Sequence, residues 1–258
     1  MLIAERQSLL RELLAQRGMS DLDTLASELQ VSQSTVRRDL EQLEQKGLVT
    51  RTHGGAIWVG DRESATTNAR PYAFDQRMEF QVDAKRKIAR AARKLVKPGE
   101  TILLDGGTTT FYLARELAGM SLQLITNSLP IANLFLNDEH IELILTGGLM
   151  YPRYGVLLGP MAESSLSAIH TKTLFLSVAG VHDGALYNQN SLLVHAERKM
   201  MAQAQRIVLL ADSGKFGQQA LARLGELAEI DAVVTDAAIP HEHRDAIGAA
   251  RCDLIIAE

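Results

Sequence analysis

The segment 20–55 constrains the fold most strongly, because its apolar and capping residues predict a helix-turn-helix followed by a short wing. Ser32 can cap a helix, since its hydroxyl can accept a hydrogen bond from a free amide of the next turn. Val36, Leu40 and Leu43 follow at positions i, i+4 and i+7, a spacing that predicts one buried stripe on that helix. Residues 48–53 then alternate towards a Gly-Gly pair, which is typical of a two-stranded wing.

The opposite stripe of the same helix indicates where DNA would bind. Ser34, Arg37, Arg38 and Glu41 lie together on it. A recognition helix contacts base edges with its N-terminal residues when it enters the major groove, and arginines bind either guanine edges or phosphates. The candidate DNA-binding residues, from the helix and the wing, are Ser32, Gln33, Ser34, Thr35, Arg37, Arg38, Arg51 and His53.

Two earlier helices complete a predicted three-helix core. Ser20 and Asp23 have the spacing of a capping box, with Asp in place of the usual Glu. The packing residues after them are Leu22, Leu25, Ala26 and Leu29, and those of the first helix, about residues 3–17, are Leu9, Leu10, Leu13 and Leu14.

The charge of this module restricts how it can bind DNA. Residues 1–60 hold seven Lys and Arg against eight Asp and Glu. Binding therefore requires an asymmetric arrangement in which Arg37, Arg38, Lys46 and Arg51 share one face. The alternative is a small helical domain that binds protein or dimerises.

Length and composition indicate a globular protein. The 258 residues are 46% hydrophobic and 22% charged, and no apolar run is long enough for a membrane span. The N-terminal residues lack the pattern of a signal peptide, and Cys252, the single cysteine, can form no internal disulfide. These features favour a cytoplasmic protein, and the net charge of −4 limits nucleic-acid contact to a local patch.

A polar stretch divides the chain into two predicted domains. Residues 59–73 lack hydrophobic periodicity and include Pro71, which predicts a linker between a DNA-binding domain, 1–58, and an effector domain, 74–258. A helix resumes after Asp83, which can cap it. On that helix Ile88, Ala91, Ala92 and Leu95 share one face, and Lys85, Arg86, Lys87 and Arg90 are expected mostly outside.

The remainder predicts an α/β domain with a mostly parallel sheet, because short apolar runs alternate with helical segments. The predicted strands are Thr101–Leu104, Leu122–Thr126, Ile141–Thr146, Thr173–Val178, Ile207–Ala211, Ala232–Thr235 and Leu254–Ala257. The predicted helices between them include Phe111–Ala118, Leu129–Leu136, Glu163–Ile169, Leu193–Ala204 and His241–Ala249.

Glycine and polar residues follow several of these strands. Asp105-Gly106-Gly107-Thr108-Thr109-Thr110 follows the first, and similar loops contain Asn127, Gly147-Gly148, Gly180 and Asp212 to Lys215. Such loops at the carboxyl ends of parallel strands bind ligands, and a helix N-terminus favours an anion. The combination predicts a site for a phosphorylated sugar or polyol, whereas the alternative is that the glycines only make tight turns. Neither G-x-G-x-x-G after the first strand nor a Walker A sequence is present, which disfavours dinucleotide and nucleoside triphosphate sites.

The motifs together resemble those of bacterial repressors of the DeoR type, also called the glycerol-3-phosphate-regulator type. They are S-x-S-T-V-R-R-D-L, R-T-H-G-G-A, L-D-G-G-T-T, T-N-S, T-G-G and A-D-S-G-K-F-G, and they cover essentially the whole length. The resemblance implies a winged helix joined to a sensor domain of ribose-5-phosphate isomerase-like fold. It also implies a repressor of carbohydrate metabolism that binds double-stranded operator DNA as a dimer or higher oligomer and releases it when a sugar phosphate binds.

Carried over to this chain, the resemblance implies a set of effector-binding residues. Glu197 and Lys199 match a Glu-x-Lys pair that closes the site, whereas residues 182–190 depart from the common pattern. That segment, which includes Asp183, is expected to set ligand specificity together with Arg153 and Tyr154. The implied effector loops contribute Asp105, Gly107, Thr108, Thr109, Asn127, Gly147, Gly148, Gly180, Asp212 and Lys215.

An enzyme is the main alternative function. A sugar-phosphate isomerase needs a carboxylate to move a proton and a cation to hold an oxyanion. The candidate carboxylates are Asp105, Asp183, Glu197 and Asp212, and the candidate cations are Lys199 and Lys215. No cofactor or metal is expected, because His241-x-His243 at a predicted helix start has no further ligand nearby in sequence.

Overall fold

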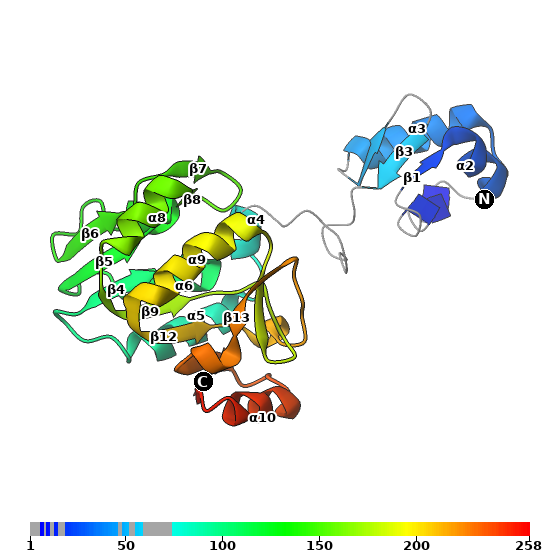
Figure 1. The fold of residues 1–258 in the computed structure, drawn as a ribbon. Helices are drawn as coiled ribbons and strands as arrows, with labels where there is room; N and C mark the ends of the chain where they lie inside the picture. Colours follow the sequence, from blue (N-terminus) through cyan, green and yellow to red (C-terminus); the bar gives the residue numbers. More distant parts are fainter. Residues whose placement is uncertain are drawn as a thin grey trace. The chain divides into compact units, whose positions relative to one another are not determined.

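The computed structural model describes residues 6–7, 9–10, 13–14, 19–45, 48–51, 55–58 and 74–258. The chain forms two compact units, Met1–Pro71 and Tyr72–Glu258, which are described separately (Figure 1).

The first unit contains helices α2 (Leu22–Leu29) and α3 (Gln33–Gln45) and a small antiparallel sheet. Val36, Leu40 and Leu43 are buried in its core with Leu10 and Leu14, which confirms the predicted stripe of α3. The sheet contains β1 (Met19–Asp21), β2 (Val49–Arg51) and β3 (Gly55–Trp58) in the order β1-β3-β2.

The β2–β3 pair confirms the predicted wing, and the structure adds three details to the sequence-based description of this unit. The predicted two-stranded wing has a third strand, because β1 pairs with β3. Ser20 lies in β1, and α2 begins two residues later, at Leu22. Leu9 is exposed, because the core takes Leu10 and Leu14 instead.

The second unit is built on a seven-stranded parallel sheet in the order β15-β14-β12-β9-β4-β5-β6. All seven predicted strands are confirmed. The inner strands β4, β5, β9, β12 and β14 are largely buried between two helical layers and therefore read as apolar runs, whereas the end strands β6 and β15 are partly exposed. The strands are β4 (Thr101–Leu104), β5 (Leu122–Thr126), β6 (Ile141–Leu145), β9 (Thr171–Leu176), β12 (Ala204–Leu210), β14 (Ala232–Asp236) and β15 (Asp253–Ala257).

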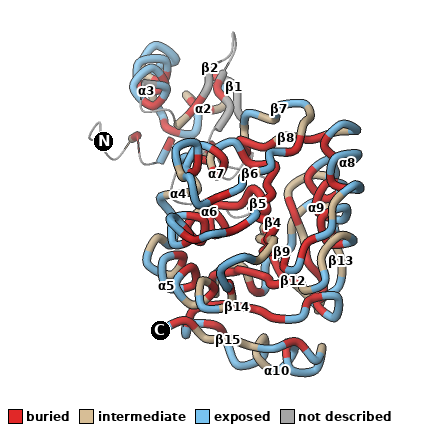
Figure 2. Tube along the Cα trace, turned by 90° about the vertical axis from the view of Figure 1, so that its left-hand side faces the viewer, coloured by how far each residue is buried: buried red, intermediate tan, exposed pale blue. Residues whose placement is uncertain are grey.

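Helices cover both faces of this sheet (Figures 1 and 2). One core contains apolar residues of α5 (Val82–Arg93), α6 (Thr108–Glu116) and α7 (Leu129–Leu134). The other contains residues of α8 (Pro160–Ser167), α9 (Ser191–Gln203) and α10 (His241–Ala249). A five-residue helix, α4 (Phe74–Met78), precedes α5. No helix in the described parts of the chain is long and apolar enough to cross a membrane.

Smaller strands lie beside the main sheet. The strands β7 (Leu149–Tyr151) and β8 (Val156–Leu158) form an antiparallel pair. A separate antiparallel sheet contains β10 (Gly180–His182), β11 (Ala185–Asn188) and β13 (Ala222–Glu226).

Two predictions for α5 were wrong. The helix begins at Val82, so Asp83 lies in its first turn and does not cap it. Lys85 is only 4% exposed, whereas Arg86, Lys87 and Arg90 are exposed as predicted. Lys85 lies three residues before the buried Ile88 on the same face, and its amine reaches a backbone carbonyl.

Candidate functional site

The N-terminus of α3 presents polar side chains to solvent. The Ser32 hydroxyl accepts a hydrogen bond from the Thr35 amide at 3.2 Å, which confirms the predicted cap. Gln33, Ser34, Arg37 and Arg38 are exposed along the helix that follows. This is the end and the face that a recognition helix needs free for a DNA groove.

Internal contacts fix the orientation of α3. The Gln33 side-chain amide donates to Asp23 of α2. On the buried side, Asp39 accepts from the Arg6 guanidinium at 2.5 Å and from the Gln7 amide. The hydrogen bond from Arg6 to Asp39 raises the pKa of that arginine, and it removes one acid of the module from the exposed surface. Arg51 lies in β2, and His53 lies outside the described residues.

The loops after the parallel strands bring most of the predicted effector residues to one edge of the second unit. Asp105 follows β4, Asn127 follows β5, and Gly147 and Gly148 come shortly after β6. Asp212 comes two residues after β12. Because neighbouring parallel strands end at the same edge of a sheet, these loops lie together there.

Asp105 is buried and tightly held. The hydroxyl and the amide of Ser177 both donate to its Oδ2, at 2.6 and 3.2 Å. Burial raises the pKa of the Asp105 carboxyl, while the bonds from Ser177 and the charge of Arg77 oppose that rise. Ser177 was missed by sequence analysis, because a serine just after a strand carries no distinguishing pattern.

Two glycines allow unusually close packing around this edge. A Cβ on Gly107 would lie 1.8 Å from the Ser177 hydroxyl oxygen, and one on Gly180 would lie 2.1 Å from the Gln218 carbonyl oxygen. Gly107 is also the N-cap of α6, and it supplies no side chain to bond the first amides. The amides of Thr108 and Thr109 therefore begin a helix whose N-terminal end favours an anion.

A second buried carboxyl, Glu197 on α9, lies close enough to Asp105 for the charge of Asp105 to act on it. Its Oε1 accepts from the Asn188 side-chain amide at 2.6 Å. Burial raises the pKa of Glu197 well above its ordinary value, and the charge of Asp105 adds to the rise.

Three basic side chains, Arg77, Lys85 and Lys215, interact with one another at this edge, and Arg77 also acts on Asp105. Sequence analysis assigned only Lys215 to the candidate site. The Arg77 guanidinium of α4 is buried over the Tyr154 ring, 4.5 Å from its centroid. Lys85 donates to the Arg77 carbonyl at 2.6 Å. Burial, with a smaller contribution from the charge of Lys215, lowers the pKa of Lys85 to about 8. Burial likewise raises the pKa of the Tyr154 hydroxyl to about 12.

Asp212 and Lys215 belong to the same basic region. The Asp212 carboxylate accepts from the Gly214 amide at 3.1 Å and begins the short 3-10 turn that contains Lys215. The charge of Asp212 raises the pKa of Lys85, opposite in direction to that of Lys215.

Other predicted residues lie at or beyond the margin of this cluster. Asp183 is exposed in the β10–β11 turn, 3.2 Å from the His182 ring. Lys199 is exposed on α9, two residues from the buried Glu197, and therefore points to another side of the helix. Arg153 is half-buried and close enough for its charge to lower the pKa of Tyr154.

Several buried polar atoms at this edge have no hydrogen-bond partner in the described protein. They are Asn127 Oδ1, Thr146 Oγ1, the Tyr154 hydroxyl, Glu197 Oε2, and Arg77 Nε and Nη2. Buried polar groups are normally satisfied, so this group of donors and acceptors is suited to a polar ligand. We refer to these residues, with Asp105, Lys85, Asp212 and Lys215, as the polar cluster.

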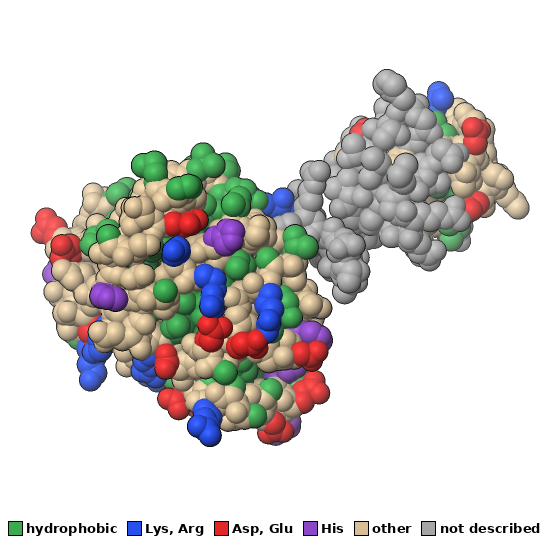
Figure 3. All heavy atoms as spheres, in the orientation of Figure 1, with side chains coloured by type: hydrophobic (Ala, Val, Ile, Leu, Met, Phe, Trp, Pro, Cys, Tyr) green, Lys and Arg blue, Asp and Glu red, His purple; other side chains and the backbone are tan. Residues whose placement is uncertain are grey.

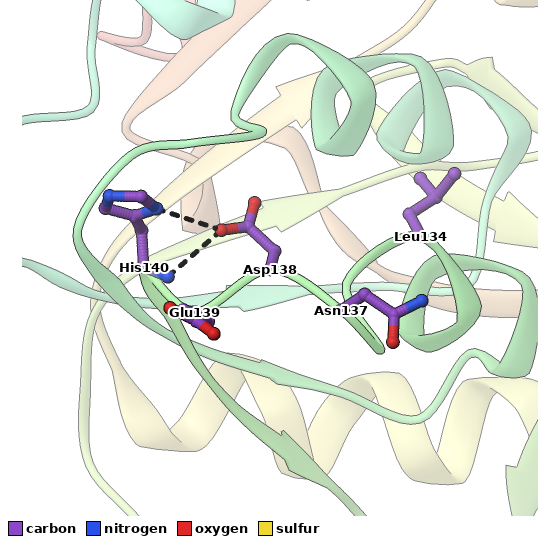
Figure 4. Close-up of a pocket in the computed structure, with 5 residues that line it drawn as sticks. All are labelled: Leu134, Asn137, Asp138, Glu139 and His140. Atoms are coloured by element: carbon purple, nitrogen blue, oxygen red, sulfur yellow. Dashed lines mark hydrogen bonds and ion pairs between the residues drawn. The ribbon is translucent and has the colours of Figure 1, made fainter.

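An open hollow of about 410 Å³ lies elsewhere, beside the amino end of β6 (Figure 4). Its Asp138 carboxylate already accepts from the Gly119 and His140 amides at 2.8 and 3.0 Å. The hollow is at the opposite end of β6 from the polar cluster, and we assign it no ligand. Within the described residues, no group of three or more His, Cys, Asp or Glu could hold a metal ion.

The two units match two parts of one protein family. Residues 6–61 match the model of the DeoR-like helix-turn-helix domain, and residues 80–237 match the model of the DeoR C terminal sensor domain. The chain belongs to the DeoR family of transcriptional regulators. It is therefore a DNA-binding regulator with a small-molecule sensor domain.

Curated proteins that are similar to this DeoR-family chain over nearly their whole length are transcriptional regulators. The HTH-type transcriptional repressor CsqR of Escherichia coli (strain K12) is 34% identical over 253 residues, which is 97% of this chain and 94% of the relative. UlaR of Shigella sonnei (strain Ss046) is 34% identical over 233 residues, 90% of each. The uncharacterized regulator YulB of Bacillus subtilis (strain 168) is 34% identical over 241 residues, which is 93% of this chain and 91% of the relative. These matches favour a regulator over the isomerase alternative.

Solved structures with similar folds are more distant. A ribose 5-phosphate isomerase A from Methanocaldococcus jannaschii has a TM-score of 0.39 and 23% identity, over 52% of this chain and 54% of that one. The eIF2B delta subunit from Chaetomium thermophilum has a TM-score of 0.44 and 17% identity, over 60% of this chain and 56% of that one. These likenesses concern the fold alone.

Proposed function

We propose that this regulator represses a carbohydrate-metabolism operon and leaves its operator when a phosphorylated sugar or polyol binds the polar cluster. The buried, unpartnered polar atoms at the ends of the parallel strands are the observation that carries the proposal. Arg77, Lys85 and Lys215 supply positive charge for a phosphate, and Asp105, Asn127 and Glu197 supply partners for sugar oxygens. Repression agrees with the name of the relative CsqR.

In this mechanism, α3 and the wing bind DNA, and two or more copies of the chain bind one operator together. Effector binding makes the operator-competent arrangement of the DNA-binding units less populated. A coupling free energy of about 1–3 kcal/mol lowers operator affinity about 5- to 150-fold.

The direct test is fluorescence anisotropy with the DNA upstream of the chain's own gene, at fixed salt, with and without a panel of sugar and polyol phosphates. Salt must be held constant because phosphate contacts make the affinity salt-dependent. Tight binding that one compound reverses supports the proposal. Turnover of a sugar phosphate without any DNA binding would contradict it.

Two variants separate the two halves of the mechanism. Arg38→Ala should abolish operator binding and leave effector binding intact, because Arg38 is exposed on α3. Lys215→Ala should bind the operator and fail to respond to effector. The control Lys87→Ala removes an exposed charge from α5 and should behave as wild type. Unchanged operator affinity in Arg38→Ala would exclude this face of α3.

A further inference from the structure

Glu197 is a buried carboxyl with only one of its two oxygens bonded. It is 3% exposed on the inner side of α9. Its Oε1 accepts from the Asn188 amide at 2.6 Å, while Oε2 is buried and has no partner among the described residues. The Oε2 atom belongs to the polar cluster, so it is available to a bound ligand.

The charges around Glu197 do not stabilise a carboxylate. The Asp105 carboxyl acts on it with a charge of the same sign, and Glu197 in turn raises the pKa of the Tyr154 hydroxyl. The cation Arg77 acts instead on Asp105 and Tyr154. The elements packed against α9 also hold charged or titratable side chains that do not shift its pKa, namely Glu163, Lys172, Tyr187, Arg206, Arg223 and Glu226. Of these, Lys172 and Arg206 pair with Glu100 and Asp253, and Arg223 pairs with Glu226.

The surroundings of Asp105 stabilise a negative charge better than those of Glu197. Asp105 accepts two hydrogen bonds from Ser177 and feels the charge of Arg77. Glu197 accepts one hydrogen bond and has no cation acting on it. A buried, uncompensated charge is costly, so a proton shared between the two belongs on Glu197. A protonated Glu197 keeps Oε1 as the acceptor for Asn188 and makes Oε2 a donor.

We propose that Glu197 is uncharged in the sensor unit and that its Oε2–H donates a hydrogen bond to a neutral oxygen of the effector, a hydroxyl or carbonyl of the sugar. The phosphate is excluded from this position because the Asp105 carboxylate lies alongside and would repel it. This inference rests on the proposed function. It adds that a neutral oxygen of the effector lies at Glu197, and that Glu197 supplies the proton of the hydrogen bond.

The proton makes effector binding depend on pH in a defined direction. Affinity is highest where Glu197 is protonated, and it falls as the pH rises through the range in which Glu197 ionises. Lys85, with its pKa of about 8, loses charge in the alkaline range and also weakens phosphate binding. Lys85 is present in every variant of Glu197, so the difference between their pH profiles reports Glu197 alone.

The test uses the full chain on its operator DNA and measures release by sugar phosphates from about pH 7 to pH 9, above the second phosphate pKa of about 6. Glu197→Gln keeps a donor and an acceptor at the same place and has no proton to lose. Glu197→Leu keeps similar bulk and has no donor. Glu163→Gln is the matched control, because Glu163 is a half-buried glutamate of the neighbouring helix α8, outside the polar cluster.

We expect Glu197→Gln to respond to the effector with a flatter pH profile than the wild type. Glu197→Leu should bind the operator normally and need about ten- to a hundredfold more effector, the cost of an unmade buried hydrogen bond. Glu163→Gln should reproduce the wild-type profile. Wild-type and Gln profiles of the same shape, or a Leu variant as responsive as the wild type, would overturn the inference.

Two measurements without effector keep this result separate from the proposed function. The infrared spectrum of the wild-type chain near neutral pH should contain a protonated-carboxyl band that Glu197→Gln lacks. Between the ordinary glutamate pKa and that of Glu197, the folded chain binds more protons than the unfolded chain, so wild-type stability should fall with rising pH relative to the Gln variant. If no sugar phosphate releases the operator, the proposed function fails. In that case, an infrared spectrum with an ionised Glu197 would still reject the inference.

Discussion

Gly107 leaves the space that Ser177 occupies in the candidate sensor site. A Cβ at this position would lie 1.8 Å from the Ser177 hydroxyl oxygen and 2.6 Å from its Cβ. Gly107→Ala must therefore displace Ser177, and Asp105 loses its two donors. We expect destabilisation of about 1–3 kcal/mol, as for other overpacked sites, together with loss of the response to effector. Thermal unfolding and operator release measure the two effects.

The control is Gly248→Ala, on α10, where an added Cβ meets nothing within 4 Å. Alanine is the better helix former, so this variant should gain up to about 1 kcal/mol and respond normally. A Gly107→Ala chain as stable and responsive as this control would show that Ser177 is not needed at Asp105.

Lys85 makes the free energy of unfolding of the sensor unit depend on pH in the alkaline range. Burial lowers its pKa to about 8, below the ordinary lysine value, so the unfolded chain binds more protons between these two values. The free energy of unfolding of the wild type should therefore rise with pH in that window relative to Lys85→Met, by about 3 kcal/mol at most. Denaturant titrations from pH 7 to pH 10 measure this. The exposed Lys87→Met should run parallel to the wild type, and a parallel Lys85→Met curve would contradict the prediction.

Sequence analysis named most of the candidate site residues that follow predicted strands, and the family resemblance added Glu197 and Tyr154, whereas Ser177, Arg77 and Lys85 were missed. Asp105, Asn127 and Asp212 were predictable because the carboxyl end of a parallel strand is a defined place. Arg77 was not, because it reaches Tyr154 from a five-residue helix that has no readable periodicity. Lys85 was assigned to the solvent side because a lysine on an amphipathic helix is usually solvated. The structure shows instead that Lys85 is 4% exposed and that its amine donates to the Arg77 carbonyl.

At the scale of elements, burial decided what the sequence could predict. The five inner strands of the main sheet lie between two helical layers, so their apolar runs could be recognised in the sequence, and the partly exposed end strands β6 and β15 also have apolar runs. The strands β1 and β10 have three residues each and no alternation, so neither was predicted. The consequence is largest in the DNA-binding unit, where β1 turns the expected two-stranded wing into a three-stranded sheet.

The central strand of that sheet gives a test of its importance. Ala56 is buried in β3, between Ser20 of β1 and Arg51 of β2. Proline has no amide to donate and is not tolerated in a central strand. Ala56→Pro should therefore destabilise the DNA-binding unit by about 1–3 kcal/mol, the cost of a buried backbone hydrogen bond left unmade, and abolish operator binding.

The Ala56→Pro prediction requires that the sensor unit be unaffected. Calorimetry should show its unfolding transition at the wild-type temperature, and effector should still raise that temperature. Ala56→Gly, which keeps the amide, should retain operator binding. Full operator affinity in Ala56→Pro would mean that the wing sheet is not needed for DNA.

At the scale of the whole molecule, the sensor unit has an apolar surface that the fold leaves uncovered. Figure 3 shows apolar side chains gathered over β7 and α8. Leu149 is 76% exposed and Met161 is 70% exposed, and Ile144 and Leu145 of β6 are partly exposed nearby in sequence. β6 is also an end strand of the main sheet, and such strands have unpaired backbone groups that favour pairing. An apolar edge of this kind is suited to a two-fold contact with a second copy of the chain.

We therefore expect Leu149→Lys combined with Met161→Lys to reduce self-association, because lysines facing one another across a two-fold contact repel. Light scattering coupled to size exclusion should show a smaller mass than for the wild type. Operator affinity should fall as well, since paired DNA-binding units bind more tightly than single ones. Leu221→Lys is the control: Leu221 is 85% exposed, but it lies beside β13, away from this edge. An unchanged mass in the double variant, or an equal loss in Leu221→Lys, would place the contact between copies elsewhere on the molecule.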